Sequence, residues 1–117
     1  MKTSELTGAA LDWAVAKCEW VPLVLAPFTG ARDFVIRGQD MKPTIVMYEP
    51  SLYWAQGGPI IEREGIAILK CPRSWAARIG FGGEHIEGPT PLIAALRCYV
   101  ASKLGDDVEL PAELLGE

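Results

Sequence analysis

The sequence lacks the patterns that direct a chain to a membrane or out of the cell. No apolar run follows a basic start, so a secretory signal peptide is not predicted. The longest apolar run, residues 21–28, contains two prolines and is too short to cross a bilayer. The three cysteines, Cys18, Cys71 and Cys98, offer neither an even pairing nor a C-x-x-C spacing. These absences predict a cytoplasmic protein with reduced thiols and no membrane contact.

Clusters of positive charge are also absent. The net charge is −4, and the 11 lysines and arginines are spread along the chain from Lys2 to Lys103. Binding to a nucleic acid polymer depends on many phosphate contacts from clustered cations, so no such partner is expected. With 117 residues, 50% of them hydrophobic and 22% charged, the composition predicts one folded domain that spans residues 1–117.

Standard catalytic and metal-binding motifs are missing too. There is no phosphate-binding glycine loop, nucleophile elbow or zinc motif. The single histidine, His85, has Glu84 and Glu87 beside it, but no second ligand stands at a metal-binding spacing and no nucleophile lies in a motif. Five acidic residues offer acid–base chemistry or Mg²⁺ binding, or form a solvated face: Glu62, Glu64, Asp106, Asp107 and Glu109. We therefore predict no catalytic residue, no metal ligand and no cofactor.

Hydrophobic periodicity predicts a helix near each end of the chain. Apolar residues recur at three- and four-residue spacing from about residue 5 or 7 to Glu19, with Ser4 and Thr7 as rival N-caps. A second helix is expected to begin with Thr90 as N-cap and Pro91 at its first position. It keeps helical spacing until Gly105, which suits a helix end.

Between these helices the sequence predicts β-structure. Short apolar or β-branched segments lie at residues 21–26, 33–37, 44–48 and 65–70. Residues 75–79 suit a strand, although their two alanines also permit a helix. The four glycines in residues 80–88 predict a mobile loop. The order helix, strands, helix predicts a small α+β fold, in which an antiparallel or mixed sheet packs against the two terminal helices.

The stretch from Pro50 to Gly65, PSLYWAQGGPIIEREG, is the main candidate for a binding site. Pro50 and Ser51 predict a turn into a short helix, with the serine oxygen accepting a backbone N–H. A turn is expected at the glycine pair, followed by an extended exit at Pro59. An aromatic wall beside a side-chain-free backbone suits a planar ligand, although an ordinary packed turn has the same composition. The candidate ligand-binding residues are Ser51, Tyr53, Trp54, Gln56, Gly57, Gly58, Arg63 and Arg37, the arginines serving to hold a phosphate or carboxylate.

Three segments of the chain resemble the NinX family of lambdoid phages. They are MKTSELTGAALDWAVAKCE, WAQGGPIIEREGI and GPTPLIAALRCYVASKLGDDVELP, which together cover about half of the chain in the expected order. The resemblance implies a small phage accessory protein that acts in the cytoplasm of an infected bacterium. The family carries no settled biochemical role, so the resemblance leaves the activity open.

The layout is also similar to that of Thoeris anti-defence sponge proteins, which are oligomers that sequester nucleotide immune signals of the host. The shared cue is Pro50-Ser51 followed by Trp54 and a charged segment, although Leu52 and Tyr53 stand where polar residues are expected. This resemblance implies a homo-oligomer that binds a cyclic nucleotide or a cyclic ADP-ribose type of signal without turnover. The alternatives are an accessory protein that binds a host protein, and an enzyme that degrades the signal.

Overall fold

A computed structural model describes residues 1–21, 23–25, 34–37, 43–45, 48–80, 83–111 and 114 of the chain. For residues 23–25, 34–37 and 43–45 the description covers the backbone alone. The expectations for side chains in these three segments, including that of Arg37, therefore lie outside the described residues.

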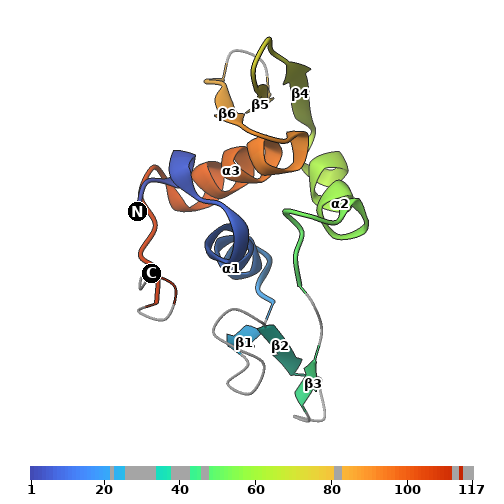
Figure 1. The fold of residues 1–117 in the computed structure, drawn as a ribbon, viewed down its shortest axis with the longest axis vertical. Helices are drawn as coiled ribbons and strands as arrows, with labels where there is room; N and C mark the ends of the chain where they lie inside the picture. The colour runs from blue at the N-terminus through green and yellow to red at the C-terminus, as the bar shows by residue number, and fades with distance from the viewer. Residues whose placement is uncertain are drawn as a thin grey trace.

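Three α-helices and one short 3-10 helix are present in this part of the chain (Figure 1). The 3-10 helix η1 spans Thr3–Glu5, and α1 spans Gly8–Glu19. Helix α2 spans Trp54–Glu64, and α3 spans Pro91–Leu104. The predicted terminal helices are confirmed as α1 and α3. At α3 the Thr90 hydroxyl oxygen accepts the N–H of Ile93 at 3.1 Å, and Gly105 follows the last turn with φ of +86°.

The described strands form two separate antiparallel sheets of three strands each. The first has the order β1-β2-β3, with the bounds Leu23–Leu25, Phe34–Arg37 and Pro43–Ile45. The second has the order β4-β5-β6, with the bounds Ile66–Lys70, Trp75–Ile79 and Ile86–Gly88. The predicted α+β class is confirmed, and residues 75–79 form a strand rather than a helix.

The prediction of a mobile loop throughout residues 80–88 is wrong at its C-terminal end, where β6 pairs with β5. Ile86 lies opposite Ala77, and Gly88 lies opposite Trp75. Gly88 serves packing, because a Cβ atom there would lie 2.6 Å from the backbone nitrogen of Ala94 on α3. The glycine therefore allows β6 to approach the start of α3 closely, which composition alone did not indicate.

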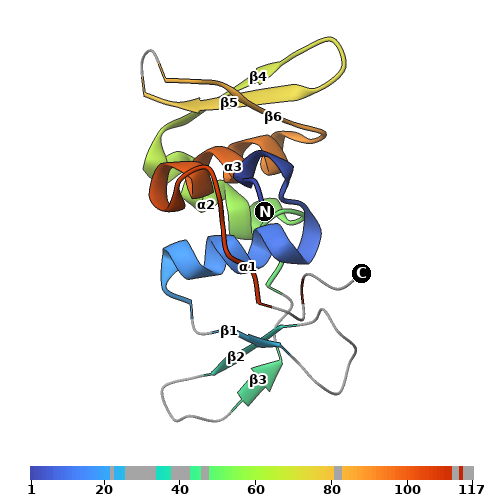
Figure 2. The ribbon, with the colours of Figure 1, turned by 90° about the vertical axis from the view of Figure 1, so that its left-hand side faces the viewer.

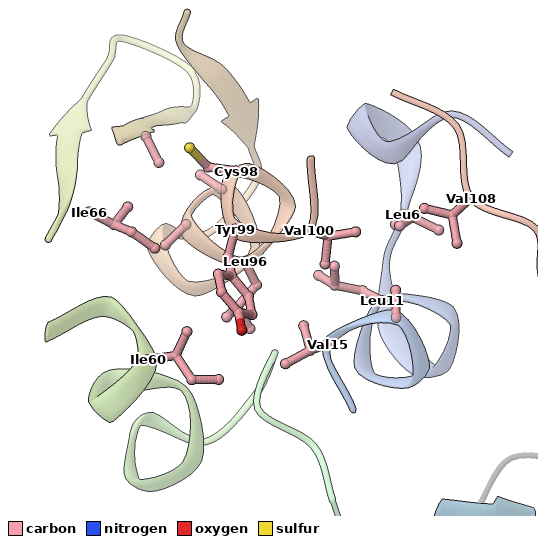
Figure 3. Packing of buried hydrophobic residues seen from close by; sticks show 14 of the residues in the cluster. Leu6, Leu11, Val15, Ile60, Ile66, Leu96, Cys98, Tyr99, Val100 and Val108 are labelled. Carbon is pink, nitrogen blue, oxygen red and sulfur yellow. The ribbon is translucent and has the colours of Figure 1, made fainter. Parts of the chain in front are cut away.

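The helices occupy the middle of the molecule, with the two sheets on opposite sides (Figures 1 and 2). Helix α3 packs on the β4-β5-β6 sheet, and α1 and α2 pack against α3. Figure 3 shows Val15 of α1, Ile60 of α2 and Leu96 of α3 pointing into the same core. This burial of apolar surface fixes the position of α2, which carries most of the predicted site.

Candidate functional site

The turn before α2 is held by a buried contact with α1. Asp12 is only 2% exposed, and its two carboxylate oxygens accept the backbone N–H of Ser51 at 2.8 Å and the Ser51 hydroxyl at 3.0 Å. Burial raises the pKa of Asp12 to about 6, because desolvation of the carboxylate outweighs the two hydrogen bonds. The expectation that Ser51 caps α2 is wrong, because the N-cap residue is Tyr53 and the helix has no side-chain cap, while the Ser51 hydroxyl donates to Asp12.

Three consecutive large side chains project from this turn into solvent. Leu52 is 63% exposed, Tyr53 is 51% exposed and Trp54 is 52% exposed. We refer to these three residues as the Leu52–Trp54 patch. Two of them, Tyr53 and Trp54, are the aromatic residues that the sequence predicted for a ligand wall. An exposed cluster of this kind is typical of a binding surface in a soluble domain.

The start of α2 leaves backbone donors available beside the Leu52–Trp54 patch. Tyr53 is the N-cap residue, and its side chain makes no capping hydrogen bond. Its carbonyl oxygen accepts the N–H groups of Gln56 at 3.0 Å and Gly57 at 2.9 Å. Among the described residues, no acceptor contacts the N–H groups of Trp54 and Ala55. Such N–H groups and the helix dipole favour an anion at this position.

The predicted turn at Gly57 and Gly58 is wrong, because both residues lie within α2. A Cβ atom at Gly57 would lie 2.6 Å from the Pro50 carbonyl oxygen and 2.7 Å from Leu92 Cδ2, so this glycine serves close packing. The extended exit at Pro59 is also wrong, since the helix continues through it. Proline has no backbone N–H, so it cannot donate the usual helical hydrogen bond to the Ala55 carbonyl oxygen. Ala55 is exposed, so water can donate to this oxygen instead.

Two further polar side chains of the predicted site that the structure describes, those of Gln56 and Arg63, already have partners. The Gln56 Oε1 atom accepts the backbone N–H of Glu49 at 2.6 Å, which fixes the segment before the turn. Arg63, at the other end of α2, donates Nη1 to Glu19 Oε1 at 3.0 Å and Nη2 to Glu19 Oε2 at 2.5 Å. The same Glu19 accepts the hydroxyl of Tyr99. Hydrogen bonds from Arg63 are the main reason that the pKa of Glu19 lies below its ordinary value.

The structure therefore divides the predicted residues into two groups. Tyr53 and Trp54 lie together and exposed, whereas Ser51, Gln56 and Gly57 support the turn that presents them. Arg63 joins α2 to α1 near their C-terminal ends, as Glu19 is the last residue of α1. Sequence reasoning missed the role of Asp12 in holding the turn. The available signal was an acidic residue within the apolar helical pattern of α1.

The alternative chemical sites find little support in the described part of the chain. His85, Glu84 and Glu87 are all exposed, and no group of three His, Cys, Asp or Glu residues there is arranged to hold a metal ion. Cys18, Cys71 and Cys98 are free thiols. Within the same residues, no helix combines the length and hydrophobicity that crossing a membrane requires.

The fold and the Leu52–Trp54 patch define a small α+β protein with an exposed aromatic surface. Residues 2–103 match the family described as Bacteriophage P22, NinX. The chain belongs to this NinX family of phage proteins, as its three characteristic segments indicated. No curated protein matches the sequence.

Proposed function

We propose that this phage accessory protein binds and sequesters a nucleotide immune signal of the infected bacterium, and that it does so without converting the signal. The ligand class is a cyclic nucleotide or a cyclic ADP-ribose derivative, taken up in the cytoplasm of the host. Sequestration requires tight binding of a planar, anionic molecule and requires no catalytic group. The function therefore depends on a surface that recognises a base and a phosphate together.

The observation that carries the proposal is the exposed pair Tyr53 and Trp54 beside uncapped backbone donors. Stacking of a base on an aromatic side chain contributes about 1–3 kcal/mol. The N–H groups of Trp54 and Ala55, which contact no acceptor among the described residues, lie at the start of the same helix, where a phosphate is favoured by both hydrogen bonding and the helix dipole. A nucleotide combines these two chemical features within one small molecule.

The other predicted residues take supporting roles in this proposal. Ser51 fixes the turn through Asp12, and Gln56 fixes Glu49, so the aromatic rings stand on a braced backbone. Gly57 allows α2 to approach Pro50, and Gly58 leaves space, since a Cβ atom there would be 3.7 Å from Trp54 Cε3. Arg63 keeps α2 against α1 through Glu19. A direct phosphate contact from Arg37 remains part of the hypothesis.

We expect the protein to act as a homo-oligomer. The Leu52–Trp54 patch is open to solvent, and a single exposed surface excludes little water from a small ligand. A second subunit placed over the patch encloses the ligand and buries the apolar side chains, as aromatic residues at interfaces commonly do. Size-exclusion chromatography with light scattering checks this expectation, and a monomer at working concentration contradicts it.

Binding of a host protein is the second candidate function, and Leu52 favours it. This aliphatic side chain is 63% exposed next to the two aromatic rings, and it offers a base no stacking surface. A contiguous exposed apolar surface is typical of a protein interaction site, and tyrosine and tryptophan are enriched where such interfaces bind most strongly. This function predicts that one host polypeptide co-purifies in a fixed ratio and that no small molecule is retained.

A depletion and release experiment separates these functions. The protein is incubated with a panel of cyclic oligonucleotides and cyclic ADP-ribose derivatives, filtered, and then heated to denature it. A compound that leaves the filtrate and returns intact on heating supports sequestration. A compound that returns altered indicates an enzyme that degrades the signal. Depletion of no compound contradicts the nucleotide proposal and favours the host protein.

A further inference from the structure

A second location separate from the Leu52–Trp54 patch also has the features of a ligand site. A groove of about 820 Å³ opens where η1, β6 and the C-terminal end of α3 meet. In Figures 1 and 2 this region lies on the side of α3 away from α2. The hydrogen bond from the N–H of Thr3 to the Asp106 carbonyl, at 2.8 Å, holds the two chain ends together along the groove.

The groove contains one buried cation, Arg97 of α3. Arg97 is only 9% exposed as a whole residue, with its Nε buried and its Nη1 partly buried, so the guanidinium is largely withdrawn from solvent and meets the groove at its outer edge. Its Nε donates to the carbonyl oxygen of Leu6 at 2.8 Å, and its Nη1 donates to the carbonyl oxygen of Glu87 at 2.8 Å. These two bonds join the segment after η1 to β6 and hold the guanidinium in a fixed orientation.

The positive charge of Arg97 has no paired carboxylate in the described part of the chain. No carboxylate oxygen of a described Asp or Glu lies within 4.0 Å of a side-chain nitrogen of Arg97, the limit for an ion pair. Both hydrogen bonds of Arg97 go to neutral carbonyl groups. Burial lowers the pKa of Arg97, and the more distant charge of Glu5 opposes that effect. A buried charge in a protein is normally neutralised by a partner, because desolvation is costly. Arg97 thus lacks the counter-ion that its environment favours.

The rest of the groove combines cations with acidic groups at its rim. Lys2 and Arg73 supply two exposed positive charges. The acidic lining residues are all exposed, and one of them is already bound, since Ser74 Oγ donates to Glu87 Oε1 at 2.6 Å. They are Glu84, Glu87, Asp106 and Asp107. Water screens these exposed carboxylates more effectively than it screens the buried guanidinium, and they can accept hydrogen bonds from hydroxyl groups.

We propose that this groove binds a small phosphorylated sugar, with its phosphate against Arg97 and its hydroxyl groups toward the acidic rim. A phosphate supplies the missing counter-ion and matches the planar fork of an arginine. The sugar hydroxyls supply donors for carboxylates that would repel a bare polyanion. The sugar phosphate is either free or part of a nucleotide. The proposal does not depend on the function of the Leu52–Trp54 patch.

NMR titration of the full chain tests the proposal, with inorganic phosphate, ribose, ribose 5-phosphate and adenosine monophosphate as probes. We expect ribose 5-phosphate to shift the backbone amide signals of Ser74 and Gly88 saturably, inorganic phosphate to bind more weakly, and ribose to have no effect. Equal affinities for ribose 5-phosphate and adenosine monophosphate indicate a sugar phosphate site. Tighter binding of adenosine monophosphate indicates a nucleotide site. Absence of a saturable shift with every phosphate probe overturns the proposal.

Matched arginine variants locate the binding. Arg73→Gln removes a positive charge from the groove, whereas Arg78→Gln removes one from β5 outside it. We expect Arg73→Gln to weaken binding of ribose 5-phosphate by about three- to tenfold, and Arg78→Gln to leave it unchanged. Equal affinities in these two variants overturn the location. Arg97→Lys, where its spectrum shows a native fold, should weaken binding further because lysine cannot make both carbonyl bonds and a phosphate contact in the same geometry.

Discussion

At the scale of single residues, Trp20 is held in a conformation that its side chain does not stabilise. It follows the last turn of α1 with φ of 58° and ψ of 32°, in the left-handed region. Its side chain is 91% exposed, so burial of the indole offers little compensation. Glycine is the residue that usually occupies this position, because it lacks the Cβ atom that creates the strain.

Replacing Trp20 with glycine should therefore stabilise the fold. We expect Trp20→Gly to raise the free energy of unfolding by about 0.5–1 kcal/mol, since strain is removed and almost no packing is lost. Chemical denaturation monitored by circular dichroism checks this value. A clear loss of stability would contradict it and would mean that the indole is buried in an assembly.

The two neighbouring glycines of α2 should respond differently to alanine. Gly57→Ala places a Cβ atom 2.6 Å from the Pro50 carbonyl oxygen and 2.7 Å from Leu92 Cδ2, so α2 has to shift. We expect a loss of about 1–3 kcal/mol. Beyond its chain neighbours, a Cβ atom at Gly58 meets Trp54 Cε3 at 3.7 Å, an ordinary contact. The higher helix propensity of alanine is opposed there by contact of the new Cβ atom with the ring of Pro59, so we expect Gly58→Ala to change stability by less than about 1 kcal/mol. Thermal unfolding of both variants checks the contrast, and equal effects contradict the packing role of Gly57.

At the scale of secondary structure elements, the sequence predicted those whose signals are local. Helices α1 and α3 show a clear apolar period, and α3 also has Thr90, Pro91 and Gly105 as start and stop signals. Helix α2 beyond its first turn was not predicted, because Gly57, Gly58 and Pro59 each disfavour a helix interior. Tertiary packing overrides that local preference: Ile60 is only 3% exposed, and Gly57 fits closely against Pro50. Strand β6 was missed because its pairing with β5 is a non-local contact.

The contact between α1 and the turn before α2 makes stability depend on pH. The pKa of Asp12 is raised from 3.8 to about 6 in the folded protein, so the folded state holds a proton more tightly than the unfolded chain does. This group therefore contributes stability below pH about 4, and the contribution is lost as the pH rises through about 6. Glu19 has a lowered pKa and acts in the opposite direction, since its contribution is lost as the pH falls.

Comparison with Asp12→Asn isolates the contribution of Asp12, because Glu19 is present in both proteins. Asparagine can bond to Ser51 without a buried charge. We expect the wild type to lose on the order of 2 kcal/mol of stability relative to Asp12→Asn between about pH 4 and pH 8. Urea denaturation at a series of pH values gives this difference. A difference that does not change with pH contradicts the buried, partly protonated Asp12.

At the scale of the whole molecule, the helices separate two sheets and bring the predicted site to the surface (Figures 1 and 2). Sequence reasoning identified Tyr53 and Trp54, whose size and polar neighbours are visible in the sequence. It could not show that Ser51 is engaged by Asp12 or that Arg63 is engaged by Glu19. Those partners lie 39 and 44 residues away, so only the fold brings them together. Among the described side chains of the predicted site, the aromatic pair is the part that stands exposed together, beside the backbone at the start of α2.

The central claim is that the aromatic pair binds a nucleotide signal, and the depletion experiment with tryptophan variants tests it most directly. Trp54→Ala removes a side chain of the Leu52–Trp54 patch, whereas Trp20→Ala removes a more exposed indole at the end of α1. We predict that the wild type and Trp20→Ala deplete the same compound and release it intact on heating, and that Trp54→Ala, with a native circular dichroism spectrum, depletes none. Equal depletion by Trp54→Ala and the wild type would contradict the claim.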